Sequence, residues 1–598
     1  MDKNILRRLQ WLLINADIRK RLRQLPISRR IAFFIIFLLC LVYILMSCLS
    51  FSSKHSSTDG CLREKLDPWR KAEENSHVST SNSDIFFIGN GYIGMGNDEQ
   101  IRIRPISARI ISLPTDLYPL ISILFKGSAS KTTGRIIDYR EGMLHDLLCF
   151  SEDNTCFCVE RKVYAHRTRP NLFVQSIVAS NPSGVPLRLN LSMKGFQKWE
   201  RIQRNGNEQL YKRMMDVDGT KLVIVAICTN LGESISVASS REESLQFICA
   251  FHYETLTSNT DSADGLKTIE NALSKKLSDA LGKKSSELDD EHSFAWHELN
   301  KVAFGLAVSF APDALNPSLI NATHHALLSH SRAPVLEVAS TDEERKEVRN
   351  FLQKQELCYS GHSTLLIPSR LWKKSTSVEE CTETVNIWMH TLEKRGCFSL
   401  LRAGAVGISQ AFSLSLIAAR FGHEHFEINI DPADIHRDIT VDNLSFLDHT
   451  NISIHFHLDD EYRPYVLVSS STKVYACSAA CLDPPLAIGK IAVKLPIKIT
   501  RPLTSILYIA EKEEQLEQLK GTIHIAEVMN APAQEQDIIA LHRHGHRLGG
   551  LPTIFWILLF GLVIAFHLFL VKLLYSEWKK GDSVPYNYYL RQRYIRTH

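Results

Sequence analysis

The most promising residues for chemistry lie together in the last third of this 598-residue chain. Asp459, Asp460 and Glu461 closely follow His455 and His457. Because a single residue separates the two histidines, a strand would place both imidazoles on one face, where they could bind a metal ion. The spacing fixes no third ligand, so we interpret the pair as a solvated strand face and predict neither a metal nor a cofactor. The three acids remain weak candidates for acid or base catalysis.

A second pattern, Gly89, Gly91 and Gly94, spells the G-x-G-x-x-G of dinucleotide-binding proteins. That motif needs a helix directly after the glycines to face the pyrophosphate. Here Ile101 and Ile103 alternate with arginines, which is the period of a strand. We therefore predict a strand, a glycine turn and another strand.

Two uncharged apolar runs, residues 31–51 and 551–571, are each long enough to cross about 30 Å of hydrocarbon as a helix. Basic residues lie before the first run and after the second, so the positive-inside rule places both termini in the cytosol. Residues 52–550 would then be lumenal or extracellular, in the endoplasmic reticulum, the Golgi or at the cell surface. The first run is predicted to be a signal anchor; cleavage near Ser47 is the alternative.

Glycosylation sequons and cysteines agree with this topology. The acceptors lie between the two runs, at Asn190, Asn321, Asn443 and Asn451. Eleven of the thirteen cysteines lie outside the first run, and an odd number leaves at least one thiol free or paired between chains. A net charge of +4, with its basic excess confined to the tails, excludes a nucleic-acid partner.

The expected fold class is a membrane-anchored α+β protein. It has a large N-terminal antiparallel β-sandwich, a reduced helical middle similar to an α/α barrel, a C-terminal β layer and two transmembrane helices. The predicted segments are a basic cytosolic tail (1–30), a transmembrane helix or signal anchor (31–51), a stalk (52–83), the sandwich (84–255), a helical linker and truncated helical region (256–421), the C-terminal β region (422–530), a juxtamembrane segment (531–550), a transmembrane helix (551–571) and a cytosolic tail (572–598).

Several motifs in the sandwich resemble family-65 glycoside hydrolases and phosphorylases, which invert configuration at α-glucosides. The matching residues are Asn90-Gly91-Tyr92, Asp138, Gly142, Leu144, Glu160, Arg161, Tyr164 and Asn181. The resemblance implies a sandwich that packs on a helical barrel. From it we take Tyr92, Trp296, Tyr359 and His362 as candidates to line a ligand site.

The catalytic part of that family is not recognisable here. An inverting glycosidase needs two carboxylates about 6.5–9.5 Å apart. We find no counterpart of the family's Asp-Glu-Tyr-His general-acid motif, and residues 320–421 are too few for about twelve helices.

A closer resemblance over the whole chain is to an uncharacterised animal membrane-protein family with a KIAA-series name and a domain of unknown function. It rests on the segments 87–92, 358–362, 393–397 and 402–404, and it brings no established activity.

These observations favour a degenerate glycosidase-like ectodomain that binds a glycan or glycoprotein, or acts as a scaffold, without catalysis. One alternative is an active inverting enzyme that uses Asp459, Asp460 or Glu461. Another is an interaction subunit that works through its tails, where Arg591-Gln592-Arg593 resembles a retention signal.

Overall fold

A computed structural model describes most of the chain between residues 57 and 581. The described ranges are 57–79, 86–105, 108–125, 130–152, 155–202, 208–256, 263–355, 357–366, 369–447, 450–546 and 553–581. The predicted first membrane run and both tails lie outside these residues.

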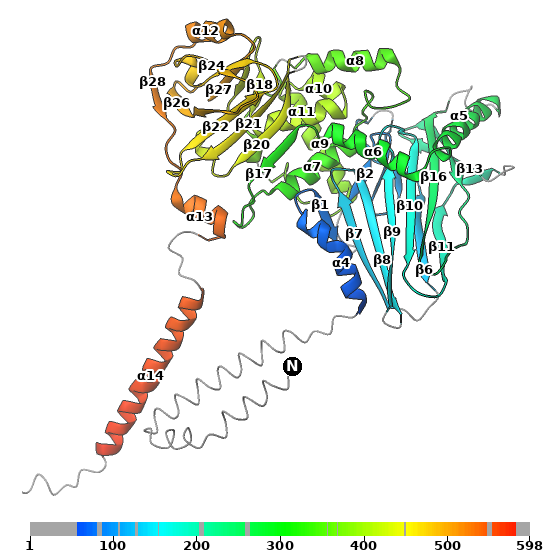
Figure 1. The fold of residues 1–598 in the computed structure, drawn as a ribbon, viewed down its shortest axis with the longest axis horizontal. Helices are drawn as coiled ribbons and strands as arrows, with labels where there is room; N and C mark the ends of the chain where they lie inside the picture. The colour runs from blue at the N-terminus through cyan, green and yellow to red at the C-terminus, as the bar shows by residue number, and fades with distance from the viewer. Residues whose placement is uncertain are drawn as a thin grey trace, which may run out of the picture.

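The N-terminal half is a sandwich of antiparallel sheets, as the alternating sequence predicts (Figure 1). Its large sheet has nine strands, in the spatial order β1 (Ser76–Ser79), β7 (Ser130–Asp138), β8 (Met143–Glu152), β9 (Thr155–Ala165), β10 (Leu172–Asn181), β16 (Arg241–Thr255), β14 (Thr220–Thr229), β13 (Glu208–Val217) and β12 (Glu200–Ile202).

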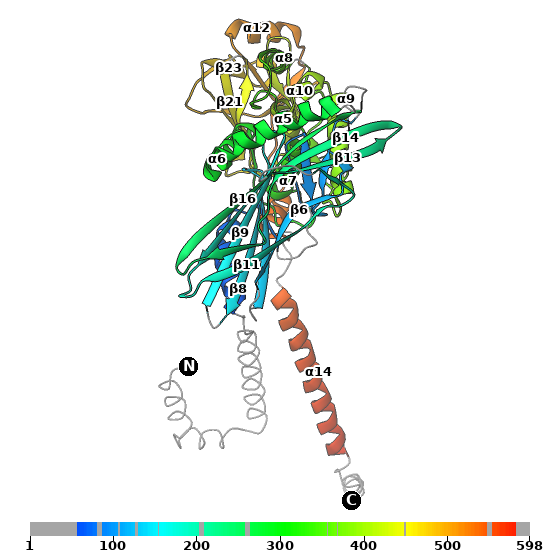
Figure 2. The ribbon, with the colours of Figure 1, turned by 90° about the vertical axis from the view of Figure 1, so that its right-hand side faces the viewer.

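Two smaller sheets form the opposite layer (Figure 2). One contains β15 (Ser234–Val237), β11 (Leu187–Phe196) and β6 (Leu117–Phe125); the other contains β2 (Phe87–Gly89), β3 (Ile93–Gly96), β4 (Ile101–Ile103) and β5 (Leu113–Pro114). A hydrophobic core fills the space between the layers, with Ile123, Leu189, Val163 and Phe173 among its members. Burying such apolar surface is the main stabilising term of a sandwich.

The glycine motif forms the β2–β3 hairpin, which confirms the prediction of a strand, a turn and a strand. Phe87 pairs with Gly96 and Gly89 with Gly94. Strand β4, not a helix, follows the hairpin.

The predicted stalk, 52–83, is wrong for its described part. Residues Ser57–Lys71 form helix α4, and β1 is the edge strand of the large sheet. Leu62 and Leu66 are buried against Ile136, Leu147 and Cys149 on the outer face of that sheet. Polar composition hid an apolar stripe at helical spacing that packs on the sandwich.

Two further helices cover other parts of the outer face. They are α5 (Ala263–Leu281) and α6 (Ser285–Leu299). Leu273, Leu277 and Leu288 pack against strand residues such as Val174 and Val223. Helices therefore follow the sandwich from Ala263 onward, within the segment expected to be helical.

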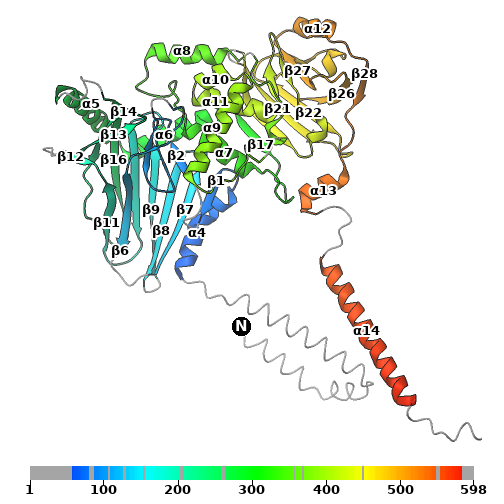
Figure 3. The same ribbon diagram turned by 180° about the vertical axis from the view of Figure 1, so that it is seen from behind.

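The remaining helices of the middle lie between the sandwich and the C-terminal strands (Figure 3). They are α7 (Pro317–Ser329), α8 (Asp342–Gln353), α9 (Val378–Lys394), α10 (Phe398–Arg402) and α11 (Ala405–Leu416), with a short 3-10 turn, η1, at Thr364–Leu366.

The C-terminal β region consists of two five-stranded sheets and a two-stranded ribbon. The first sheet contains β17 (Ala303–Leu306), β20 (Ile439–Phe446), β21 (Thr450–Leu458), β22 (Pro464–Ser470) and β25 (Val493–Pro496). The second contains β18 (Ala419–Phe421), β19 (Phe426–Ile428), β27 (Leu507–Ala510), β23 (Val474–Cys477) and β24 (Leu486–Ile488); the ribbon is β26 (Lys498–Arg501) and β28 (Glu527–Asn530). Short helical elements η2 (Pro432–Asp434), η3 (Ala479–Cys481), α12 (Glu513–Thr522) and α13 (Gln536–His544) complete the region.

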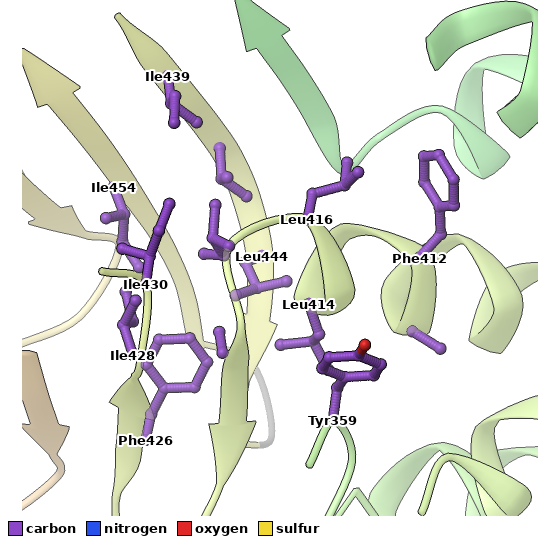
Figure 4. Packing of buried hydrophobic residues seen from close by; sticks show 14 of the residues in the cluster. Tyr359, Phe412, Leu414, Leu416, Phe426, Ile428, Ile430, Ile439, Leu444 and Ile454 are labelled. Atoms are coloured by element: carbon purple, nitrogen blue, oxygen red, sulfur yellow. The ribbon is translucent and has the colours of Figure 1, made fainter. Parts of the chain in front are cut away.

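The helical middle and the C-terminal sheets share one core. Phe412, Leu414 and Leu416 of α11 lie in the same buried cluster as Phe426 and Ile454 (Figure 4). The segment boundary expected at 421/422 therefore falls inside a continuous packed unit.

Helix α14 (Thr553–Gly581) extends away from the rest of the protein (Figure 1). Its segment Ile554–Lys579 is the one stretch among the described residues that is long and apolar enough to cross a membrane. The prediction of two such helices is confirmed for one only.

The described residues contain five disulfides. They are Cys61–Cys156, Cys149–Cys158, Cys228–Cys249, Cys358–Cys397 and Cys477–Cys481. The leftover thiol expected from the odd count is the buried Cys381.

Candidate functional site

The Asn90-Gly91-Tyr92 motif joins the sandwich to its own loops rather than opening toward solvent. Asn90 is fully buried. Its Nδ2 donates to the carbonyl oxygens of His166 at 3.0 Å and Pro170 at 2.9 Å. Its Oδ1 accepts from the amides of Tyr92 and Ile93, both at 2.9 Å. A buried side-chain amide whose nitrogen and oxygen both have hydrogen-bond partners has a structural role.

The next residue, Gly91, contacts the C-terminal end of α7. Its amide donates to the Ser329 carbonyl at 2.9 Å. Its φ is +82°, and a Cβ built there would lie 2.1 Å from the backbone nitrogen of Arg332. Only glycine satisfies both the conformation and this close approach.

Arg167 also contacts the C-terminal end of α7. Its guanidinium donates to the carbonyls of Leu328 at 3.0 Å and Ser331 at 2.8 Å, and lies 5.3 Å from the Trp296 ring centroid. Complete burial lowers the pKa of Arg167 to about 10. A cation is favourable there, because the carbonyl end of a helix carries partial negative charge.

Alternating side chains on β8 and β9 serve opposite faces of the large sheet. Asp146 and Arg161 are directly opposite each other and form an ion pair in the sandwich interior. Their chain neighbours His145 and Glu160 pair on the outer face, at 2.8 Å. The Glu160-Arg161 motif thus supports two separate polar clusters.

The interior cluster borders a cavity of about 280 Å³. Arg135 donates to Asp146 at 2.7 Å and to Glu99 at 3.2 Å, while Arg161 also donates to the Ile121 carbonyl. The cavity is lined by Ser79, Ser122, Ile123, Leu124, Lys131, Thr133, Gly134, Arg135, Asp146, Leu147, Leu148 and Arg161. We call this the sandwich pocket.

The charges around the sandwich pocket determine what it can do. Burial alone would raise the pKa of the Asp146 carboxyl, but Arg161 and Arg135 outweigh burial and hold that pKa below its ordinary value. Asp146 therefore stays ionised at neutral pH and is unsuited to act as a general acid. With Lys131 added, the lining contains three cations and one carboxylate.

Comparison with known proteins gives a family. The model of a family described as "Uncharacterized conserved protein (DUF2152)" matches residues 14–597. The chain belongs to this family.

Relatives match over nearly the whole length. A protein from Xenopus laevis, named "Uncharacterized protein KIAA2013 homolog", is 26% identical over 569 residues, which cover 90% of this chain and 91% of the relative. Its counterpart from Xenopus tropicalis is 27% identical over 561 residues, with 88% and 89% covered. The closer resemblance given by the sequence motifs is thus confirmed.

A solved structure described as a proposed kojibiose phosphorylase from the human microbiome is also similar. It matches with a TM-score of 0.34 and 10% identity, over 61% of this chain and 62% of that one.

The four residues taken as candidates to line a ligand site are dispersed. Tyr92 stacks on Tyr253, with centroids 4.4 Å apart, and burial raises its pKa. Trp296 is fully buried and stacks on His325 at 4.9 Å. Tyr359 is buried in the helical core.

The fourth, His362, is exposed, and its carbonyl accepts from the Tyr359 hydroxyl at 3.1 Å. None of these four residues lines the sandwich pocket.

The three candidate acids lie on the exposed turn between β21 and β22. Asp459 Oδ1 accepts from the amides of Glu461 at 2.9 Å and Arg463 at 2.8 Å, which shapes the turn. Asp460 is exposed, and Glu461 pairs with Arg463 at 3.3 Å. Their contacts are those of a turn.

The two histidines on β21 face the same way, as predicted, and each contacts a carboxylate of the neighbouring chain segment. His455 lies 2.8 Å from Asp442, and His457 lies 3.2 Å from Asp438.

The sequon asparagines differ in exposure. Asn443 is exposed, at a bulge of β20 with φ +56°. Asn190 and Asn451 are half-buried on strands, and Asn321 donates to the Glu74 carbonyl at 2.6 Å.

Sequence reasoning missed the polar residues inside the sandwich. Arg135, Asp146 and Arg161 face the interior from three neighbouring strands. The available signal was the placement of Asp146 and Arg161 between apolar core positions two residues away on either side, namely Leu144 and Leu148 on β8 and Val159 and Val163 on β9. Sequence reasoning also missed a group of metal-type ligands, Asp138, Glu141 and His145, whose ligand atoms lie within 4.8 Å of one another.

Proposed function

We propose that the protein is a membrane-anchored protein of the secretory pathway whose lumenal domain binds a glycan or glycoprotein without cleaving it. The five disulfides support an oxidising compartment. The exposed apolar helix α14 supports a membrane anchor.

The observation that carries the binding proposal is the sandwich pocket. Its volume suits a single sugar residue, and its lining combines hydroxyls with arginines that can bind carboxylates or sulfates. We infer that the preferred ligand is an acidic glycan, because cations outnumber carboxylates in the lining.

The same pocket supports binding without hydrolysis. Inverting hydrolysis requires an acid and a base on opposite sides of the sugar. The lining holds one carboxylate, Asp146, whose Oδ1 accepts from Arg135 and whose Oδ2 accepts from Arg161. The acids of the β21–β22 turn lie in another region of the chain and help to shape their own turn.

A glycan-array screen of the full chain in detergent tests the proposal. We expect selective binding of carboxylated or sulfated glycans, weakened about tenfold by Lys131→Glu, which reverses an exposed charge in the lining. Lys221→Glu, an exposed lysine on β14, is the matched control and should bind like the wild type.

If Lys131→Glu leaves glycan binding unchanged, the sandwich pocket is not the binding site. Turnover of an α-glucoside, abolished by one carboxylate substitution, would overturn the non-catalytic proposal.

A further inference from the structure

The β7–β8 turn brings three potential metal ligands together on the outer face of the sandwich. Asp138 ends β7, Glu141 lies in the turn, and His145 is on β8. Their ligand atoms lie within 4.8 Å of one another. Asp138 is diagonal to His145 in the register, since Ile136 pairs with His145, so both side chains lie on the same face.

The contacts of His145 suit a metal ligand. It is 4% exposed, and its Nδ1 lies 2.8 Å from Oε1 of Glu160. Its Nε2 is buried and has no hydrogen-bond partner. A carboxylate that accepts from one ring nitrogen leaves the lone pair of the other nitrogen free, which is the usual arrangement behind metal-bound histidine.

The carboxylates are also held in place. Oδ1 of Asp138 accepts from the amides of Arg140 at 2.8 Å and Glu141 at 3.3 Å, which orients the group within its turn. The turn itself is fixed by Asn300, whose Nδ2 donates to the carbonyls of Tyr139 at 3.3 Å and Arg140 at 3.2 Å. A site built on such a fixed turn loses little conformational entropy on binding.

Two aromatic residues enclose this region. Trp69 of α4 has its ring centroid 4.9 Å from that of His145. Trp296 of α6 packs on Gly142, where an added Cβ would lie 2.0 Å from its ring. The site therefore lies where two helices and the large sheet meet, and its surroundings exclude water from much of it.

We propose that Asp138, Glu141 and His145 bind a divalent transition-metal ion, for which zinc is the best fit. One imidazole and two carboxylates match the donor preferences of zinc, whereas an imidazole ligand disfavours calcium and magnesium. Three protein ligands leave one position for water or an external ligand. The site is distinct from the sandwich pocket, because His145 and Asp146 point to opposite faces of β8.

The test measures metal content and metal affinity of the full chain, purified in detergent without a histidine tag. After chelation and readdition, we expect one zinc ion per chain with micromolar or tighter affinity, and an increase in melting temperature, because the ion binds the folded state. Cobalt in place of zinc should give visible absorption bands of a nitrogen- and oxygen-ligated site, a readout that needs no variant.

Two substitutions locate the ion. Glu141→Gln removes a ligand at a half-buried turn position, and Glu160→Gln removes the support of His145; each should weaken zinc binding at least tenfold. The matched control is Glu254→Gln, because Glu254 forms a similar pair with His252 at 3.5 Å outside the proposed site. It should bind zinc like the wild type.

Absence of zinc binding, or binding that neither Glu141→Gln nor Glu160→Gln weakens, would overturn the proposal. Because the cobalt spectrum is recorded on the wild-type chain, a variant that fails to fold does not remove the test.

Discussion

Single residues decide how the sandwich meets the helical middle, and Gly91 is the sharpest case. It combines a positive φ with a backbone approach that leaves no space for a side chain. Gly219, in the β13–β14 turn, has a similar φ of +78° but nothing within 4 Å of an added Cβ. Comparing substitutions at the two glycines therefore separates the free-energy cost of the positive φ from the cost of a steric clash.

We predict that Gly91→Ala destabilises the protein far more than Gly219→Ala. The conformational cost common to both is about 1–2 kcal/mol, while Gly91→Ala must also displace the backbone at Ser331 and Arg332. Melting temperatures of the two purified variants measure the difference. Equal shifts would show that the helix end yields to the added methyl group.

At the scale of elements, helix α4 is an integral layer of the sandwich. Cys61 links it to Cys156 of β9, and Leu66 is 1% exposed. Its contacts also place Trp69 against His145. The helix is therefore covalently linked to the large sheet and packed on its outer face.

We predict that Leu66→Ala lowers stability by about 2–5 kcal/mol, the usual cost of truncating a buried leucine. Glu64→Ala, an exposed position on the same helix, should change stability by less than about 0.5 kcal/mol. Denaturant unfolding gives both values, and limited proteolysis should cut the helix sooner in Leu66→Ala. If Leu66→Ala has wild-type stability, the packing of α4 on the sheet does not contribute to the stability of the sandwich.

The junction between α6, α7 and the sandwich contains neutral histidines. Burial lowers the pKa of His166 and His330 to about 3 and that of His325 to about 4, and it also lowers the pKa of His292. His330 Nδ1 accepts from the Ile111 amide at 3.2 Å, which requires that nitrogen to be unprotonated.

The sign of the pH effect follows from these pKa values. Below about pH 6.5 the unfolded chain takes up protons at these histidines and the folded chain does not, until the pH approaches about 3–4. Stability from these groups is therefore full above about pH 6.5 and is lost as the pH falls. Each group contributes at most about 1.4 kcal/mol per pH unit in that window.

We predict that the melting temperature falls between pH 7 and pH 5, and that His330→Asn makes the fall shallower. Asparagine can keep an acceptor near the Nδ1 position but does not titrate. Scanning fluorimetry across this range measures the slope. His297→Gln, an exposed histidine of α6, is the control. A slope unchanged in His330→Asn would mean that this site does not contribute to it.

At the scale of the whole molecule, topology is the main prediction. We predict that both termini are cytosolic and that the residues between the two apolar runs are lumenal, because basic clusters lie at the outer ends of the runs. Tags at each end, probed in selectively permeabilised cells, measure the orientation. A missing N-terminal tag on the mature protein would indicate cleavage near Ser47.

Glycosylation provides an independent measurement of the same topology. We expect a glycosidase-sensitive mobility shift that is lost when the asparagines at 190, 321, 443 and 451 become glutamine. The largest single effect should come from Asn443→Gln, because that side chain is exposed. A wild-type chain without glycan would contradict the lumenal placement.

Local signals in the sequence determined much of the architecture. Period-2 runs predicted the strands of the sandwich, and helical spacing of apolar residues predicted helices between residues 256 and 421. The β2–β3 hairpin followed from glycine chemistry. Charge-free length alone identified the apolar helix near the C-terminus. Each of these properties depends on residues close together in the chain.

Only the tertiary structure decided which distant residues meet. Asp146 and Arg161, or His145 and Glu160, acquire their roles from strand register, which places each pair on a particular face. Leu62 and Leu66 lie in a polar segment and are core residues only because the sheet offers them an apolar surface. The acids at 459–461 are candidates for chemistry by residue type, yet Asp459 accepts hydrogen bonds from backbone amides of its own turn. Strand register and packing depend on contacts between segments that are remote in the chain, and the order of residues does not show which segments meet.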